Sequence, residues 1–251
     1  MYEDEELERL EQEEHELTEE ALILLFATLT STKTELETEL RKFYQKYGKD
    51  GVVTYSEARK WVSTKDRRKR INVLSLLIAE RFSTALDNMS YDFTRLVESV
   101  IKKESSFFGV EINVDIPVKW GYDKLDWYDR LENDVNKWNA KIRADVKQSV
   151  LQRKHLDEVL ELLEDRFESM RYVLETLGIS ETTAVGSLAR NEIFKELGIT
   201  KYKFYTCADE RRCEVCGSMH GLVFPMTAYE VGVTASPMHP RCRCWEVPIR
   251  E

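Results

Sequence analysis

Proline is distributed very unevenly along this chain of 251 residues. Pro117 stands alone before residue 225, whereas Pro225, Pro237, Pro240 and Pro248 all fall within the last 27 residues. A proline inside a helix removes a backbone donor and clashes with the preceding turn. The first four fifths of the chain are therefore free to form long helices, and the carboxy-terminal tail is not.

Apolar residues at helical spacing fill the proline-poor region. We expect helices over residues 3–29 and 34–47, a short helix within 54–61, and a long one from about 65 to 103. The apolar stripe of the long helix mostly steps by three or four residues: Leu74, Leu77, Ile78, Phe82, Leu86, Met89, Phe93, Leu96 and Val100.

The pattern changes at Gly109, where apolar and polar residues begin to alternate in "FFGVEINVDIPVKW". This alternation predicts a strand or an extended connector. Helical spacing returns in two stripes, and the seven-residue rhythm of the second favours nearly antiparallel packing. We expect one helix to end at Gly178, Ser180 to cap the next, and Gly198 to end that one. The stripes are Leu131, Val135, Trp138, Ile142 and Val146, then Leu156, Leu160, Leu163, Phe167, Met170, Leu174 and Leu177.

The predicted fold class is mainly α with a small β element. The residues of "TKYKFYTC" (200–207) favour a strand, and "GLVF" (221–224) is its expected partner. The chain is accordingly divided into a helical amino-terminal region with an acidic arm (1–108), a connector (109–126) and a helical or α+β module (127–251). That module carries a zinc-knuckle-like tail with a Cys/His cluster at 207–244.

The net charge of −9 resides in one segment of the chain. Residues 1–20 hold eleven acidic residues and one arginine, a local charge of −10, which leaves about +1 for the other 231. We expect this acidic arm to be exposed and to become ordered on a basic partner surface. The basic run Lys65–Arg70 and the arginines near the cysteines are interpreted first as solvated surface, with contact to phosphates as the alternative.

The amino terminus has no apolar segment typical of a signal peptide, and the apolar runs are too short to span a bilayer. We therefore expect a reducing compartment and no contact with a membrane. Structural disulfides are rare in such compartments, and five cysteines cannot all pair.

Four of the five cysteines and two of the four histidines lie between residues 213 and 244. Cys213 and Cys216 have the spacing of a knuckle that turns two thiolates toward one metal ion, and the glycine that follows permits the turn. His239 and Cys242, three residues apart, are the predicted second pair, and Cys242 with Cys244 is the competing pair. Thiolate-rich sets of four donors favour a structural zinc ion. His220 and Cys207 are outer candidates.

These motifs resemble the signature of the phage head-morphogenesis family, also called Mu F-like minor capsid proteins. The resemblance lies in "YKFYTCADERRCEVCGSMHGLVF" and "SPMHPRCRC", with Asp209 and Arg211 leading into the knuckle. The upstream segments "WYDRLENDVNKW" and "ARNEIFKELGITKYKFY" are also similar, so that residues 127–248 are covered. The chain departs from the family pattern in two ways. His220 stands where the family usually has an Asp, and the family's customary Thr-Glu pair has only loose counterparts in this sequence.

The resemblance implies a structural, non-enzymatic minor head protein of a tailed phage, which acts in head assembly or DNA delivery. The implied partners are the portal protein and other capsid components, with transient contact to packaged DNA. The implied location is the capsid interior near the portal, after assembly in the host cytoplasm.

Two other functions were weighed against this one. The first is a zinc-containing nucleic-acid-binding module, and the second is a metal-dependent nuclease. A nuclease would need a histidine base and oxygen ligands around a second metal ion. His220 and Asp209 are candidates for such groups, but the sequence lacks the residue spacing that is typical of such an enzyme.

Overall fold

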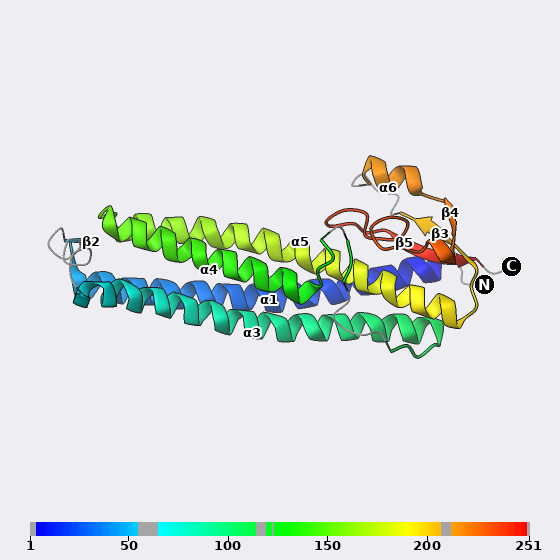
Figure 1. Cartoon of the computed structure of the whole chain (residues 1–251), viewed down its shortest axis with the longest axis horizontal. Helices are drawn as coiled ribbons and strands as arrows, with labels where there is room; N and C mark the ends of the chain where they lie inside the picture. The colour runs from blue at the N-terminus through cyan, green and yellow to red at the C-terminus, as the bar shows by residue number, and fades with distance from the viewer. Residues whose placement is uncertain (1–3, 55–64, 114–118, 122, 207–211, 250–251) are drawn as a thin grey trace. The chain divides into compact units, whose positions relative to one another are not determined.

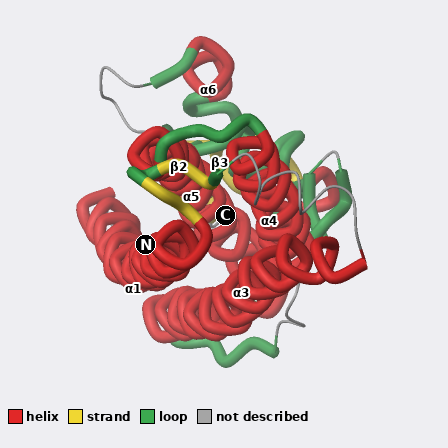
Figure 2. Tube along the Cα trace, turned by 90° about the vertical axis from the view of Figure 1, so that its left-hand side faces the viewer, coloured by secondary structure: helices red, strands yellow, loops and turns green. Residues whose placement is uncertain are grey.

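The computed structural model describes residues 4–54, 65–113, 119–121, 123–206 and 212–249, with the backbone alone for residues 4, 5, 7, 8, 11 and 65–73. Most of these residues are helical, and the strands form two small sheets (Figure 1, Figure 2). The predicted fold class is thereby confirmed. Among the described residues, none of the helices is long and apolar enough to cross a membrane.

Four long helices and two short ones were found within the described ranges. They are α1 (Asp4–Tyr47), α3 (Lys65–Phe108), α4 (Trp127–Leu151), α5 (Leu156–Glu196), α6 (Glu214–Met219) and the 3-10 helix η1 (Met226–Ala228). The first sheet pairs β1 (Gly48–Lys49) with β2 (Val52–Val53). The second has the order β4 (Val223–Pro225), β3 (Lys201–Tyr205), β5 (Trp245–Ile249), and all of its pairs are antiparallel.

The chain folds into two compact units. Unit 1 comprises Met1–Ile23, Tyr91–Arg130 and Leu174–Glu251, and unit 2 comprises Leu24–Ser90 and Leu131–Val173. Helices α1, α3, α4 and α5 contribute residues to both units. The division expected from the sequence at residues 109–126 stays a prediction.

Helix α1 is continuous, so the predicted break between residues 29 and 34 is wrong. The threonines in this stretch do not end the helix, and each hydroxyl instead donates to a carbonyl oxygen four residues earlier. Thr30 donates to Phe26 at 2.7 Å, and Thr32 donates to Thr28 at 2.9 Å. Thr34 repeats the pattern onto Thr30. The apolar stripe continues through the stretch, with buried leucines at 25, 29, 36 and 40.

Helix α5 is also continuous through Gly178 and Ser180, which contradicts the predicted end and cap. Ser180 and Thr182 donate their hydroxyls to the carbonyl oxygens four residues earlier, at 2.6 and 2.9 Å. A Cβ atom at Gly178 would lie 2.9 Å from a methyl carbon of Leu22. The glycine therefore serves the close approach of α1 to α5 in unit 1, and it does not end the helix.

Helix α3 extends to Phe108, and Gly109 follows with a φ of +67°. This confirms the predicted break at Gly109, since a positive φ suits glycine. Residues 110–113 form no strand, so the described part of the expected segment is a connector. Two expectations lie outside the description: the short helix within 54–61, apart from Thr54, and the side chains of the basic run Lys65–Arg70.

Unit 2 buries the apolar stripes of its helical segments against one another. The predicted stripe of α3 supplies Leu74, Ile78, Phe82 and Met89, and the rings of Phe82 and Phe167 stack with their centroids 6.3 Å apart. Partly exposed ion pairs flank this core, for example Arg166 Nε with Asp145 Oδ2 at 2.8 Å. The core confirms the helical spacing read from the sequence.

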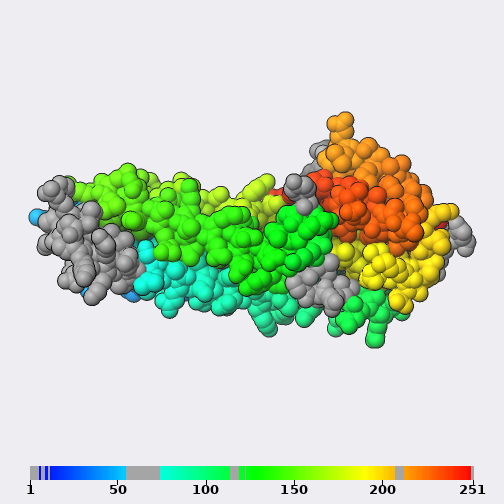
Figure 3. Space-filling view, viewed as in Figure 1, coloured from blue at the N-terminus to red at the C-terminus, as the bar shows by residue number. Residues whose placement is uncertain are grey.

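The sheet of unit 1 begins where α5 ends. Gly198 has a φ of +66°, and the amide of Ile199 donates to the carbonyl of Phe194 at 2.9 Å, which closes the helix as predicted. The predicted pairing of β3 with β4 is confirmed, with Tyr202 opposite Phe224. Strand β5 was not predicted. It pairs with the other edge of β3 and places Trp245 opposite Tyr205. In Figure 3 the orange and red atoms of this tail lie against the yellow atoms of the end of α5.

The acidic arm is not exposed all round, which corrects the expectation from its charge. Leu10, Glu14 and Thr18 are buried along one face of α1 in unit 1, whereas Glu16, Glu19 and Glu20 are exposed. The arm therefore packs within the chain through one side and presents carboxylates to solvent on the other.

Candidate metal centre

The first pair of cysteines sits at the amino-terminal end of α6. The sulfur of Cys213 accepts a hydrogen bond from the amide of Cys216 at 3.3 Å, so that Cys213 caps the helix. The amide of Gly217 donates to the Cys213 carbonyl at 2.9 Å. This turn brings both thiols to the same side of the knuckle, as the spacing predicts.

The second group of donors lies on the loop before β5, and hydrogen bonds hold this loop on α5. The Arg241 amide donates to Ser180 Oγ at 2.9 Å, and Thr183 Oγ1 donates to the Cys242 carbonyl at 2.9 Å. The Arg241 guanidinium also pairs with Glu175, with Nη2 and Oε1 2.8 Å apart. The hydroxyls in the middle of α5 thus position the loop that carries Cys242.

The donor atoms lie at distances close to those of a tetrahedral site. His239 Nε2 is 3.2 Å from both the Cys213 and the Cys216 sulfurs, and the Cys216 and Cys242 sulfurs are 3.8 Å apart. Zinc bond lengths give edges of about 3.8 Å between two thiolates and about 3.5 Å between a thiolate and an imidazole nitrogen. These three pairs of donors therefore have separations that one ion can bridge.

Two triplets of donors can be drawn in this cluster, and they share one residue. Cys213, Cys216 and His239 form the first, and Cys216, Cys242 and Cys244 form the second. Within each triplet all ligand atoms lie within 4.8 Å of one another. Cys216 is thus the donor through which the two ends of the intervening loop meet.

The imidazole of His239 is oriented by its neighbour. Its Nδ1 lies 2.8 Å from the Pro240 carbonyl oxygen, which fixes the proton on Nδ1 and leaves the Nε2 lone pair facing the sulfurs. Burial lowers the pKa of His239, but the hydrogen bond to Pro240 and the neighbouring Cys242 and Cys213 outweigh burial and raise it. The ring is arranged as a ligand through Nε2.

The thiols influence one another strongly. A hydrogen bond from Cys244 is the main cause that lowers the pKa of Cys242 to about 6, and the same contact raises the pKa of Cys244. Burial, followed by the charge of Cys242, raises the pKa of Cys216 to about 12. In the absence of a cation, these neighbouring sulfurs cannot all ionise together. A bound metal ion would supply the positive charge that allows several thiolates to coexist.

All five predicted donors gather in this cluster: Cys213, Cys216, His239, Cys242 and Cys244. His220 points elsewhere. Its Nδ1 accepts a hydrogen bond from the Thr206 amide at 3.2 Å, and its ring packs against Tyr205 with the centroids 4.8 Å apart. Cys207, Asp209 and Arg211 lie outside the described residues.

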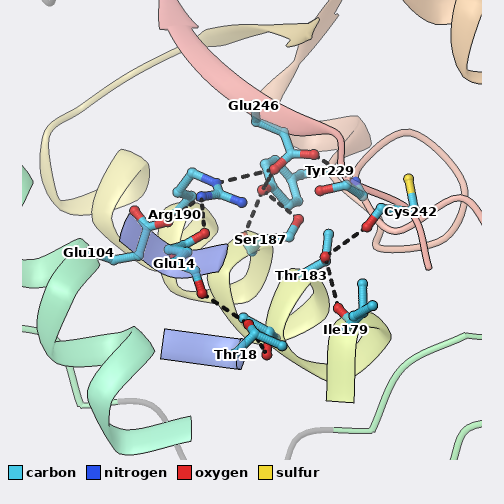
Figure 4. A network of polar contacts seen from close by, with 12 residues as sticks. Glu14, Thr18, Glu104, Ile179, Thr183, Ser187, Arg190, Tyr229, Cys242 and Glu246 are labelled. Atoms are coloured by element: carbon cyan, nitrogen blue, oxygen red, sulfur yellow. Dashed lines mark hydrogen bonds and ion pairs between the residues drawn. The ribbon is translucent and has the colours of Figure 1, made fainter. Parts of the chain in front are cut away.

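A buried ionic cluster in unit 1 was missed in the sequence. Arg190 of α5 pairs through Nη1 with Glu104 of α3 and, at 3.6 Å, with Glu14 of α1, while its Nε lies 3.3 Å from Glu246 of β5 (Figure 4). All four side chains are at least nine-tenths buried. The arginine stands in the mixed polar and apolar stretch "SLARNEIF", which gives only a weak signal of such a cluster.

The charges of this cluster are unequal in number, one guanidinium against three carboxyl groups. Burial raises the pKa of Glu104 well above its usual value, although Arg190 opposes the shift. Glu104 therefore holds its proton more readily than an exposed glutamate does, and it shares Arg190 with Glu14 and Glu246. Tyr229 adds a neutral donor, because its hydroxyl lies 3.1 Å from Glu246 Oε2.

Comparison with known protein families gives a match to this region of the chain. Residues 140–247 match the family model described as phage Mu protein F like protein. This stretch is Mu F-like. The match confirms the resemblance drawn from the cysteine motifs, over a shorter range than the 127–248 expected, and it contains all five clustered donors. No curated protein and no solved structure is significantly similar to the chain. The matched residues make up less than half of the chain, and the similarity is that of this stretch alone.

Proposed function

We propose that this protein is a structural minor head protein of a tailed phage, which acts at the portal vertex in head assembly or DNA delivery. The observation that carries the proposal is the match of residues 140–247 to the Mu F-like family. Long helices and the exposed carboxylates of α1 support a role in assembly. The partners are the portal protein and other capsid components, and the protein resides inside the capsid after assembly in the host cytoplasm.

Incorporation into particles tests this function. Heads purified from a phage that encodes this chain are analysed by quantitative mass spectrometry, with the portal protein as the internal reference. We expect a low-copy component that stays with the heads after nuclease treatment and salt washing. A protein found in the lysate and missing from purified heads would overturn the proposal.

The metal centre of this proposal is one structural zinc ion held by Cys213, Cys216, His239 and Cys242. His239 Nε2 is within 3.2 Å of the first two sulfurs, and Cys242 both touches Cys216 and acts electrostatically on His239. Four such donors leave no position for water, which is typical of structural sites. Cys244 is the neighbouring thiol that contacts Cys242, and it is the alternative fourth ligand in place of His239.

Elemental analysis of the purified chain tests the ligand set. We expect one zinc per chain in the wild type and in Cys244→Ser, and loss of zinc in Cys213→Ser and Cys242→Ser. Ser218→Ala, an exposed position on α6, serves as the matched control. Retention of zinc in His239→Asn together with its loss in Cys244→Ser would replace the proposed set by four thiolates.

Contact with packaged DNA is the remaining part of the proposal, and it also separates the alternatives. Transient binding through exposed basic side chains such as Arg212 should weaken steeply as salt rises. Binding that is flat across salt concentrations would exclude a mode driven by phosphates. Incubation with plasmid and Mg²⁺ or Mn²⁺ tests the nuclease alternative. Cleavage of the plasmid that disappears when a zinc ligand is substituted would favour this alternative.

A further inference from the structure

The loop that carries three of the five donors is closed by a carboxylate. Glu246 lies in β5. Its Oε1 accepts a hydrogen bond from the Ser236 amide, with the nitrogen and the oxygen 2.6 Å apart. Ser236 precedes His239, and Glu246 follows Cys244 by two residues. Glu246 therefore ties the two ends of the ligand loop (236–246) together, and it is completely buried.

The ligand positions and Glu246 are also close to one another in the tail. Cys242 and Cys244 lie just before β5, and Glu246 is the second residue of this strand. Phe204 connects the two features, since it pairs with Glu246 across the β3–β5 ladder and packs in the buried cluster of Cys216, Cys242 and Cys244. A shift of Glu246 would therefore move the sulfurs next to it.

The second oxygen of Glu246 reaches the ionic cluster. Its Oε2 lies 3.3 Å from Arg190 Nε. The Nη1 of Arg190 pairs with Glu14 of α1 and Glu104 of α3 (Figure 4). Glu14 lies over Gly186, where a Cβ atom would be 3.0 Å from its Oε1. A single guanidinium thus connects the carboxylate that closes the ligand loop to the amino-terminal helix.

A polar pocket brings the same elements together a second time. It has a volume of about 140 Å³, and Glu14 and Thr18 of α1 line it beside Cys244 and Trp245 of the tail. The ionic contacts through Arg190 therefore link α1 to the tail beside this pocket, in addition to the apolar cluster in which Leu10 of α1 packs near Val247 of β5.

We propose that Glu246 is a positioning residue of the metal centre and that, through Arg190, it couples metal binding to the docking of α1. This inference rests on the proposed zinc site and adds its regulation. Coupling is reciprocal, so metal loading stabilises the docked helix and the docked helix raises the affinity for the metal. Groups that orient metal ligands from the next layer typically change metal affinity by about 10- to 100-fold.

Zinc affinity of full-length variants tests the first direction. Competition with a chromophoric chelator is measured for the wild type, Glu246→Gln and Glu14→Gln, with Glu16→Gln on the exposed side of α1 as the matched control. We expect a loss of about tenfold or more for Glu246→Gln, a smaller loss for Glu14→Gln and no change for the control. Folded Glu14→Gln and Glu246→Gln variants with the wild-type affinity would overturn the coupling.

Hydrogen exchange of the wild type tests the second direction and requires no variant to fold. Amides of residues 12–18 are compared in the zinc-loaded and zinc-free protein, with residues 34–44 of unit 2 as the internal reference. We expect faster exchange in residues 12–18 after zinc removal, and unchanged exchange in the reference. Equal exchange in residues 12–18 contradicts the coupling alone, whereas a chain that binds no zinc contradicts the proposed metal centre and the coupling with it.

Discussion

The hydroxyl oxygens of Thr18 in α1 and Thr182 in α5 lie 3.0 Å apart, and both side chains are buried. Four residues to one side of this pair, Glu14 lies over Gly186, and four residues to the other side Leu22 lies over Gly178. The two segments therefore run antiparallel in unit 1 and meet through small or hydrogen-bonded residues. Steps of four place these contacts along one row of each helix.

Substitution of Gly178 by valine should disrupt this close approach. The new side chain would meet Leu22, and overpacking of this kind typically costs about 1–3 kcal/mol. Urea unfolding of Gly178→Val, Leu22→Ala and the double variant measures the effect. We expect the double variant to lose less stability than the sum of the two single ones, since the shortened side chain makes room for the valine. Additive losses would show that the two positions do not touch.

Removal of the Arg190 charge should destabilise unit 1 severely. In Arg190→Met, Glu14 and Glu246 lose the cation that they share in a buried site, and such a change typically costs about 3–5 kcal/mol. The measurement is the free energy of unfolding in urea. Arg9→Met provides the control, because this arginine is exposed and its pair with Glu13 spans 3.8 Å. A cost below 1 kcal/mol for Arg190→Met would contradict the role given to the cluster.

Stability should depend on pH through Glu181. Burial raises the pKa of Glu181 to about 7, while Arg130 and the hydrogen bond from Trp120 oppose the shift. The folded state then holds a proton that the unfolded state has released, so stability is fully present below about pH 4.5 and is lost as pH rises to 7. The difference amounts to about 3 kcal/mol for this group.

The comparison of the wild type with Glu181→Gln isolates this contribution. Unfolding free energies at pH 4.5, 6 and 7.5 should fall more steeply with pH in the wild type than in the variant. Glu132→Gln, which changes a partly exposed carboxyl on α4, serves as a control. Identical slopes for the wild type and Glu181→Gln would rule out the raised pKa.

Metal removal should loosen the tail before it affects the helices of unit 2. Structural zinc in small modules contributes on the order of 10 kcal/mol of folding free energy, and an ion in this cluster would join the two ends of the loop between the donor groups. Limited proteolysis after treatment with a chelator should therefore cut first within residues 212–244. Earlier cleavage within residues 131–151 of α4 would show that the metal does not hold the tail.

The helical spacing, the glycine ends at 109 and 198, and the pairing of β3 with β4 could all be predicted, because each depends on neighbouring residues. The cysteine spacing likewise predicted the knuckle at Cys213. The errors have a common cause. "TSTK" and "LGIS" resemble helix ends locally, yet hydroxyls bonded to carbonyls four residues earlier and the packing of Leu22 on Gly178 keep both helices intact.

The ionic cluster and β5 could not be predicted from local pattern. Glu14, Glu104, Arg190 and Glu246 are separated by 56 to 90 residues between successive members, and nothing in their immediate neighbours shows that they meet. Glu14 in particular stands among ten other acidic residues of the first twenty, and its burial becomes visible only when α1 is placed beside α5. Strand β5 contains Pro248, which hid its pairing with β3.

The contact between Arg190 and Glu246 has a practical consequence for anyone who shortens this chain. A fragment that starts after α5 would keep every sulfur of the cluster and still leave an anion inside the protein without its counter-ion. The cysteine-rich end is for this reason a poor candidate for an autonomous miniature domain, and an expression boundary belongs upstream of Leu156, where the helix that carries the arginine begins.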